Sequence, residues 1–213
     1  MINLALIYES LPALLHGTLI TLRIAFLSCI IGLIGGTLLG IAQTSHNKWL
    51  KRIVSFYITI IRGTPMLFQI IIFVYIIPLP IPDIYAAILA IGINSAAYIC
   101  EVISSGILSV SKGQREAAQI LGLSPWQINR YIILPQAFRT ILPALGNEFF
   151  TLIKDSSLAS IVGVMELFKE GSIIISRHYD AISIYAIVGL IYLILTSTVS
   201  LMVSHVQKKL NYV

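Results

Sequence analysis

The sequence predicts an all-α membrane protein with five transmembrane helices and a short helical hairpin on the cytoplasmic side. Of the 213 residues, 57% are hydrophobic and only 11% are charged, and the mean hydropathy is +0.92. Charged residues make up about a quarter of an ordinary soluble domain. Uncharged runs also recur along the chain, and their length is close to that of one helical span, about 20 residues. These observations exclude a soluble enzyme and favour a polytopic membrane protein.

The five expected spans are separated by charged or proline-rich segments. The first begins near Gly17, and the second ends at the proline-rich segment 78–82, through which no helix continues. Glu101 is the only charge in the third span, the fourth carries several charges, and the fifth has none up to Ser204. The expected ranges are 17–43, 58–78, 84–108, 141–167 and 181–206, within one transmembrane domain of residues 1–213.

Three glycines repeat at every fourth position of the first span. Gly32, Gly36 and Gly40 therefore share one face of a helix. Because glycine has no side chain, such a face lets a second helix approach closely in a membrane. We interpret the repeat as a packing surface and not as a phosphate-binding loop.

The distribution of Lys and Arg predicts the orientation of the chain. Cytoplasmic loops of membrane proteins are enriched in these residues. One side would carry Lys48, Lys51, Arg52, Lys112, Arg115, Arg130, Arg139, Lys208 and Lys209, and the other only Lys169 and Arg177. We therefore expect the N-terminus outside and the C-terminus in the cytoplasm. The formal net charge of +5 is then a topology signal, and we expect membrane lipid but no nucleic acid as a partner.

The long cytoplasmic segment 109–140 contains helix start and stop signals. A strong helix former begins at Glu116-Ala117-Ala118, and Gly122 is placed to close it with a left-handed residue. Ser124-Pro125 is typical of an N-cap followed by proline in the first turn, and Pro135 is expected to stop the second helix. The segment thus predicts two short helices joined at a glycine.

This segment resembles the EAA loop of the membrane subunits of bacterial ABC importers. The match covers Gly113-Gln114-Arg115-Glu116-Ala117-Ala118, then Gly122, then Ile132-Ile133-Leu134-Pro135 at the family's spacing. In that family the loop is a coupling helix that docks into a groove of the cytoplasmic ATPase. The resemblance implies that coupling depends on Glu116, Ala117, Ala118, Gly122, Leu134 and Pro135.

Three further segments resemble the polar amino acid permeases, the histidine, glutamine and arginine uptake group. They are Arg62-Gly63-Thr64-Pro65-Met66-Leu67-Phe68-Gln69, Asn94-Ser95-Ala96-Ala97-Tyr98-Ile99-Cys100-Glu101 and Leu152-Ile153-Lys154-Asp155-Ser156-Ser157-Leu158. The resemblance implies a type I ABC importer permease fold in a bacterial inner membrane. One departure stands out, because Ser104-Ser105-Gly106 stands where the family usually has Arg-Gly-Gly.

The family also implies the partners. They are a cytoplasmic ATPase dimer, a second copy of the permease or a homologous permease, and an extracytoplasmic amino-acid-binding protein. The chain has no G-x-x-x-x-G-K-[ST] phosphate loop, so we expect no enzymatic activity and no cofactor of its own. ATP and Mg would be bound by the ATPase.

Charged and polar residues inside the spans are candidates for the substrate path, because a charge at the bilayer centre costs about 3 kcal/mol. Asn94, Tyr98 and Glu101 share one helix face, and so do Glu148, Thr151 and Asp155, so the two stripes can line one cavity. The candidate binding residues are Asp155 and Glu101 for an ammonium group, Thr64, Gln69 and Asn94 for a carboxylate, and Met66 for packing.

Structural interpretations compete with these assignments. Lys154 and Asp155 can form an ion pair, Glu101 can be solvated at the interface, and Met66 can be a core residue. Arg62 is interpreted as an anchor at the cytoplasmic boundary. Cys29 and Cys100 are expected to be small core residues.

An alternative function is an ion-coupled secondary transporter or a channel subunit, with Glu101 and Asp155 carrying the coupling charge. Such a protein has no need of an ATPase-docking loop. The four histidines are scattered along the chain, so no metal site is expected. A membrane-embedded enzyme would require a nucleophile with a base, and the sequence offers no such set. The sequence does not identify the amino acid.

Overall fold

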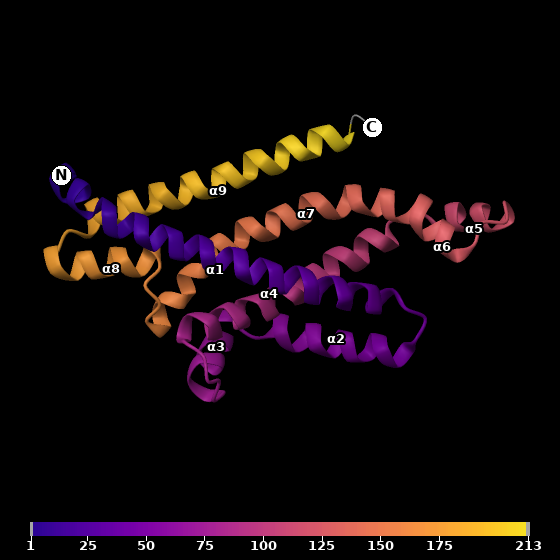
Figure 1. The fold of residues 1–213 in the computed structure, drawn as a ribbon, viewed down its shortest axis with the longest axis horizontal. Coiled ribbons are helices and arrows are strands. Elements are labelled where there is room, and N and C mark those ends of the chain that lie inside the picture. The colour runs from indigo at the N-terminus through magenta and orange to yellow at the C-terminus, as the bar shows by residue number, and fades with distance from the viewer. Residues whose placement is uncertain (1, 212–213) are drawn as a thin grey trace.

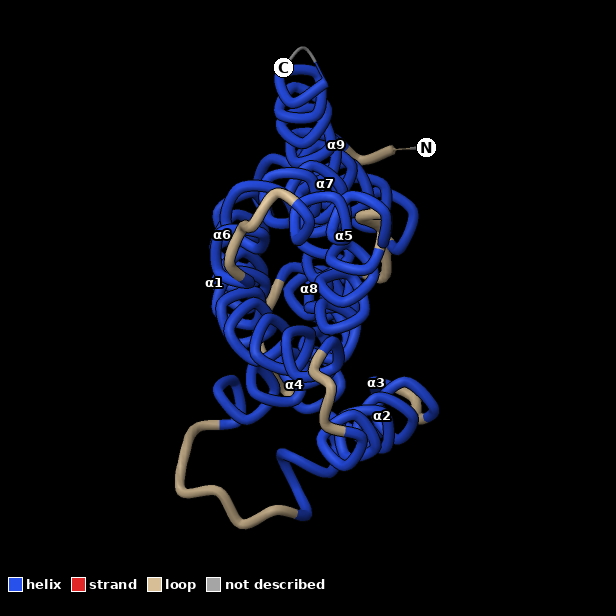
Figure 2. The backbone as a smooth tube through the Cα atoms, turned by 90° about the vertical axis from the view of Figure 1, so that its right-hand side faces the viewer, coloured by secondary structure: helices blue, strands red, loops and turns tan. Residues whose placement is uncertain are grey.

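The computed structural model describes residues 2–211, with side chains for residues 2–208, so the side chain of Lys209 lies outside the described set. The elements in order are α1 (Leu4–Thr44), α2 (Lys48–Gly63), α3 (Met66–Ile71), η1 (Ile72–Ile76), α4 (Asp83–Leu108), α5 (Lys112–Ile120), α6 (Pro125–Ile128), η2 (Asn129–Ile133), α7 (Leu134–Asp155), η3 (Ser156–Val162), α8 (Leu167–His178) and α9 (Ala181–Asn211). No strand occurs within residues 2–211 (Figure 2). The prediction of an all-α protein is confirmed.

Helices α1 and α4 form the centre of an elongated bundle. They run side by side along its length, with α7 and α9 on one side (Figure 1). A Cβ at Gly36 or Gly40 would lie 2.6 Å from the side chain of Ile99 or Ile103 of α4, and one at Gly32 would lie 2.7 Å from Ser95 Oγ. The predicted glycine packing surface is therefore confirmed, and it packs α1 against the face of α4 that carries Ser95, Ile99 and Ile103.

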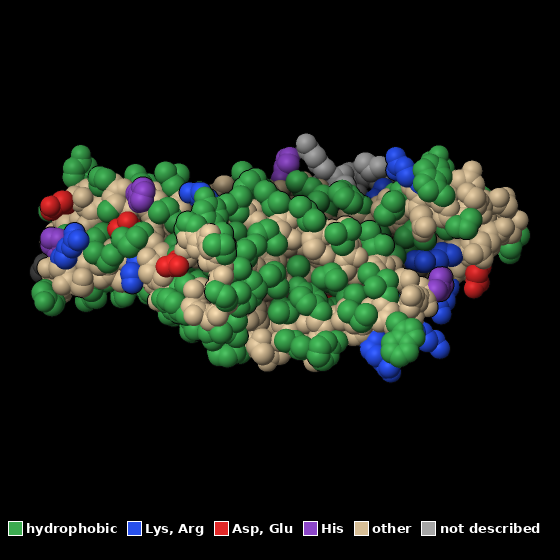
Figure 3. Space-filling model, turned by 60° about the horizontal axis from the view of Figure 1, so that its bottom comes forward, with side chains coloured by type: hydrophobic (Ala, Val, Ile, Leu, Met, Phe, Trp, Pro, Cys, Tyr) green, Lys and Arg blue, Asp and Glu red, His purple; other side chains and the backbone are tan. Residues whose placement is uncertain are grey.

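Within residues 2–211, three helices are long and apolar enough to cross a membrane. They are α1, α4 and the part of α9 from Ala181 to Lys208. The middle of the bundle is mainly apolar in Figure 3, and charged side chains gather toward its two ends. These features match a membrane protein, while the count of five spans stays a prediction.

The second expected span is a bent pair of helices. Helix α2 begins at Lys48, before the expected 58, and it is bent by 100° from the segment that continues to Ile76. Pro65 lies at the break and lacks an N–H, so the chain cannot continue its helical hydrogen bonds there. The proline-rich segment 78–82 lies between η1 and α4, as predicted.

The fourth expected span, 141–167, is also not one α-helix. Helix α7 begins at Leu134 and ends at Asp155, and the 3₁₀ segment η3 follows it to Val162. Gly163 then has a φ of 85°, in the left-handed region that favours glycine. Glu166 follows as the N-cap of α8. The α-helical part of this span therefore ends at the candidate residue Asp155.

The predicted hairpin is present as α5 and α6. Gly122 has a φ of 79°, and Ser124 and Gln127 form a capping box at the start of α6. The prediction that Pro135 stops a helix was wrong, because Pro135 lies in the first turn of α7. The preceding π-helical segment η2 shifts the hydrogen bonds by one residue, with Leu134 N bonding to Asn129 O. Proline, which cannot donate, is tolerated in the first helical turn.

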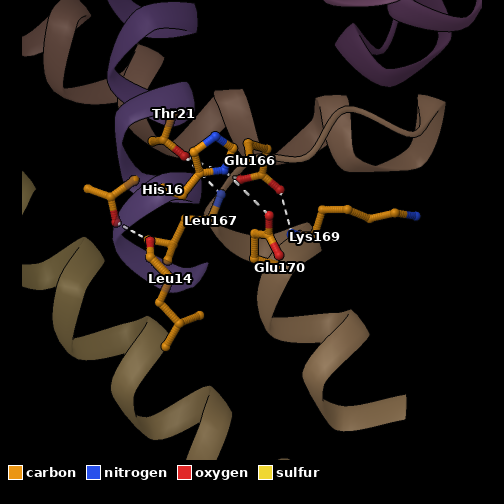
Figure 4. Close-up of polar contacts among 8 residues, drawn as sticks. Leu14, His16, Thr21, Glu166, Leu167, Lys169 and Glu170 are labelled. Atoms are coloured by element: carbon orange, nitrogen blue, oxygen red, sulfur yellow. Dashed lines mark hydrogen bonds and ion pairs between the residues drawn. The ribbon is translucent and has the colours of Figure 1, made fainter. Parts of the chain in front are cut away.

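A buried carboxylate joins three helices at the opposite end of the bundle. Figure 4 shows Glu166 between α1 and α8, where its oxygens accept hydrogen bonds from the Phe168 and Lys169 backbone N–H groups at 2.9 and 2.8 Å. The Tyr192 hydroxyl of α9 donates at 2.9 Å and the Thr21 hydroxyl of α1 at 3.4 Å. Glu166 is 0% exposed, so this carboxylate is satisfied by donors without a cation.

Candidate functional site

A polar cavity of about 390 Å³ lies where the bent segment, α4 and α7 meet. Its lining residues come from three separate parts of the chain: Thr64, Pro65, Met66, Asn94, Tyr98, Glu148, Thr151 and Asp155. The break between α2 and α3 supplies the first three, and the polar stripes of α4 and α7 supply the rest. The prediction that the two stripes line one cavity is confirmed, with the exception of Glu101.

The amides of Gln69 and Asn94 support the wall of this cavity. Gln69 Nε2 donates to the carbonyl of Ile61 at 2.7 Å and to Thr64 Oγ1 at 2.8 Å, next to the break that Pro65 creates. Asn94 Nδ2 of α4 donates to Gln69 Oε1 at 3.0 Å. Both side chains are buried. The Gln69 amide is therefore engaged in hydrogen bonds within the protein and does not line the cavity, whereas Asn94 lies in the lining.

Two carboxylates face the cavity from α7. Glu148 Oε1 accepts a hydrogen bond from Ser95 Oγ of α4 at 2.7 Å. Asp155 has no side-chain hydrogen bond or ion pair within the described part of the chain. The Lys154 ammonium instead lies 4.5 Å from the centroid of the Phe150 ring. The cavity therefore offers negative charge and acceptor oxygens to a ligand.

Glu101 lies in a second hollow, of about 450 Å³, further along α4. Tyr98 and Glu148 line both spaces. The Glu101 carboxylate forms an ion pair with Arg62 of α2. Ser104, which stands where the resembled family usually has arginine, is also in the lining of this hollow.

The tip of the α5–α6 hairpin exposes apolar side chains. Ile120 is 86% exposed, Leu121 is 78% exposed and Trp126 is 66% exposed. The hairpin is nevertheless well supported, because Arg115 donates to the carbonyl of Ile107 at 2.8 Å and Gln136 donates to Gln114 at 2.7 Å. Such a firmly held apolar tip outside the spans is typical of a protein-docking surface.

The candidate coupling residues occupy different parts of this hairpin. Ala118 is buried in its small core, Glu116 and Ala117 are exposed on α5, and Gly122 forms the connection. Leu134 and Pro135 are exposed at the start of α7. Among the described residues, no group of His, Cys, Asp and Glu could hold a metal ion.

Apolar helices long enough to span a membrane, an internal cavity lined by carboxylates and a hairpin with an exposed apolar tip are together typical of a membrane transport subunit. The comparison with protein families agrees, since residues 32–212 match the model described as the binding-protein-dependent transport system inner membrane component. The chain belongs to this family. It is accordingly a permease subunit, which is a non-enzymatic membrane component of an ABC importer.

Similar proteins and a similar structure are found over nearly the whole chain. The chain is 37% identical to the glutamine transport system permease protein GlnP of Escherichia coli K12, with 96% of each chain covered. It is 35% identical to the arginine transport system permease protein ArtQ of Bacillus subtilis, with 94% of each covered. A crystal structure of an amino acid ABC transporter with histidines contains a chain that is 35% identical, with a TM-score of 0.92 and coverage of 98% and 99%. The similarity therefore extends over the cavity and the hairpin alike.

Sequence reasoning overlooked the roles of two residues at the site and of one structural carboxylate, Glu166, outside it. Glu148 was recognised as part of a stripe but not as a binding candidate. The available signal is that Glu148 shares a helix face with the candidate Asp155. Arg62 was interpreted as a boundary anchor, and only the structure brings it to Glu101. Glu166 received no role, because its four donors come from segments that are distant in the sequence or from the following backbone.

Proposed function

We propose that the chain forms the translocation path for polar amino acids and couples it to a separate cytoplasmic ATPase. The observation that carries this proposal is the pair of carboxylates, Glu148 and Asp155, facing one cavity inside an apolar bundle. Charges at membrane depth are costly and usually serve a pathway or a ligand. The relatives named for glutamine and arginine transport support the same substrate class.

The cavity would receive an amino acid by matching its charges. Asp155 and Glu148 would accept hydrogen bonds from an ammonium group or a cationic side chain. Asn94 would donate to the carboxylate with its remaining N–H, and the phenol of Tyr98 is a second donor in the lining. Thr64 and Met66 would contact the substrate from the break. Gln69 would act through its support of Asn94 and Thr64 rather than by contact.

The orientation that we propose places the hairpin in the cytoplasm and the N-terminus outside. The start of α2, the hairpin and the end of α9 lie toward one end of the molecule, and α8 and the N-terminus lie toward the other (Figure 1). The former end contains most of the Lys and Arg residues outside the spans. This asymmetry is the one expected of a cytoplasmic end.

The partners would complete a binding-protein-dependent importer. An ATPase dimer that binds ATP and Mg would dock at the exposed hairpin tip, and a second permease copy or a homologous permease would close the path. An extracytoplasmic binding protein would deliver the amino acid. The apolar tip and the charge asymmetry support these assignments, as does the family.

The coupling assignment is tested with Gly122→Asp in a strain that also expresses the ATPase of the same transport system. A Cβ at Gly122 meets nothing within 4 Å, and its φ of 79° lies in the left-handed region, which Asp and Asn adopt more readily than most other residues. We expect normal insertion, loss of the co-purified ATPase and loss of amino acid uptake.

The control is Gly122→Asn, because asparagine tolerates the left-handed conformation and carries no charge. It should retain most of the uptake. Full uptake by Gly122→Asp would refute the coupling assignment, and failure of the wild-type chain to retain any ATPase would refute the proposed function itself.

A further inference from the structure

An ion pair joins the end of α2 to the polar face of α4. Arg62 lies one residue before the end of α2, and its guanidinium pairs with the Glu101 carboxylate. The guanidinium carbon is also 4.8 Å from the centroid of the Tyr98 ring. The two charged side chains are 36% and 48% exposed. They are thus held together in a partly open space and not sealed in the core.

This pair lies at the second hollow, next to Tyr98, which lines both hollows. Asn94 and Tyr98 line the first hollow, whereas Tyr98, Glu101, Ser105 and Leu108 line the second. These positions follow one another on a single helix face, so the second hollow continues the first toward the C-terminal end of α4. That end leads to the α5–α6 hairpin. An amino acid leaving the cavity in this direction would meet Arg62 and Glu101 next.

The attachment of α2 to α4 does not depend on this pair. The Tyr57 hydroxyl of α2 donates to the carbonyl of Ile93 at 2.5 Å. The buried amides of Gln69 and Asn94 join the break to α4 at 3.0 Å. Half-exposed ion pairs contribute little to folding. The ion pair can therefore be removed while the other two contacts keep α2 and the break attached to α4.

We propose that Arg62 and Glu101 form a charge gate at the exit of the cavity, which opens by exchanging partners with the transported zwitterion. The amino acid carboxylate takes the place of Glu101 at Arg62, while its ammonium group pairs with Glu101. Each protein charge then keeps an opposite charge during passage, which avoids an unpaired charge inside the membrane. This inference rests on the proposed function, since it concerns an amino acid leaving the cavity.

The gate is tested in proteoliposomes that contain the permease with the ATPase and binding protein of the same transport system. Vesicles preloaded with labelled amino acid report leakage without ATP, and empty vesicles report ATP-driven uptake. We expect Arg62→Gln and Glu101→Gln each to raise leakage up to about fivefold, the factor that a lost contact of about 1 kcal/mol produces in a rate. Unchanged leakage in both variants would overturn the proposal.

Two further variants separate charge from shape. The swap Arg62→Glu with Glu101→Arg restores an ion pair and should return leakage to the wild-type level. Arg62→Lys keeps the positive charge and should leak far less than Arg62→Gln. Equal leakage from Arg62→Lys and Arg62→Gln would overturn the charge gate, even if the swap does not fold.

The matched control is Arg23→Gln. Arg23 also lies over a tyrosine of α4, 5.3 Å from the centroid of the Tyr85 ring, but it pairs with no carboxylate in the described part of the chain. It should leave leakage unchanged, and leakage equal to that of Arg62→Gln would count against a gate located at Arg62. If the wild-type system shows no ATP-driven uptake, the proposed function fails. If the wild type transports and the Arg62 and Glu101 variants stay sealed, only the gate fails.

Discussion

Asp155 and Glu166 are two carboxylates at the ends of one short segment, and their surroundings are opposite. Glu166 is 0% exposed and accepts hydrogen bonds from two backbone N–H groups and two hydroxyls. Asp155 lines the polar cavity without a side-chain partner in the described part of the chain. The hydrogen-bonding capacity of Glu166 is used within the fold, whereas Asp155 is available to bind the substrate in the function that we propose.

This difference teaches how to separate structural from functional charges in a membrane protein. Both residues lie in the fourth expected span, where a charge is costly, so this cost alone does not assign a role. The number of hydrogen-bond donors directed at each carboxylate distinguishes the two residues. Glu166 fixes α8 to α1 and α9, whereas Asp155 and Glu148 form the acidic wall of the path that we propose.

The largest expected effect is on stability, from Glu166→Ala. The substitution leaves buried donors of α1, α8 and α9 without an acceptor, which costs about 3 kcal/mol. We expect a clearly lower melting temperature in detergent, measured with a thiol-reactive dye that reports exposure of Cys29 and Cys100. Both cysteines are shielded from solvent to different degrees in the folded chain.

The control for Glu166 is Glu170→Gln on the same helix. Glu170 is 3.7 Å from His16, and their side chains are 13% and 65% exposed, respectively. A pair with one solvent-exposed partner contributes about 0–1 kcal/mol. Its melting temperature should stay close to that of the wild type. Equal losses in the two variants would contradict the distinction between the buried joint and an ordinary ion pair.

A smaller effect, on transport and not on folding, is expected from Glu148→Gln. The amide oxygen can still accept the hydrogen bond from Ser95, while the negative charge of the cavity wall is reduced. We expect the apparent affinity for the amino acid to fall up to about tenfold, equivalent to about 1.4 kcal/mol. Concentration-dependent uptake measures this effect.

Ser95→Ala sharpens the same test, because it removes the hydrogen bond and keeps the charge. It should lower stability by about 1 kcal/mol and leave the affinity nearly unchanged. If Ser95→Ala weakens binding as much as Glu148→Gln, Glu148 acts through its position and not through its charge.

The smallest effect is expected outside the spans, at Asp180. The Ser183 hydroxyl and backbone N–H both donate to this carboxylate and lower its pKa. A lowered pKa in the folded chain contributes stability above the unfolded pKa, about 3.9, and this contribution disappears as the pH falls through the folded value.

Asp180→Ala should therefore lower the melting temperature slightly at pH 7, and the difference from the wild type should shrink below about pH 4, near the unfolded pKa. A pH series of melting curves measures this trend. A difference that persists unchanged into strong acid would show that the contribution of Asp180 does not depend on its charge.

The fold was largely predictable because its signals are local or periodic. The glycine repeat predicted the close approach of α1, and Gly122 with Ser124-Pro125 predicted the hairpin. The two polar stripes predicted the cavity because helical periodicity determines which side chains share a face. Pro135 misled the prediction, because a π-helical segment can carry a chain into proline without stopping the helix.

The contacts between distant segments were not predictable in the same way. Nothing in the sequence places Arg62 against Glu101, or Thr21 and Tyr192 against Glu166, since these contacts depend on how the helices cross. The role of Gln69 shows the same limit. Its residue type suited a substrate carboxylate, but its amide is used at the break that Pro65 creates.

The central claim, that the acidic cavity is the amino acid path, is tested most directly with Asp155→Asn. Labelled amino acid uptake would be measured in proteoliposomes containing the permease, its ATPase and its binding protein. The account predicts an ATPase that remains docked, an unchanged melting temperature and a loss of ATP-driven uptake of about tenfold or more, as expected for removal of a charged contact of at least about 1.4 kcal/mol. Uptake with wild-type rate and apparent affinity would contradict it.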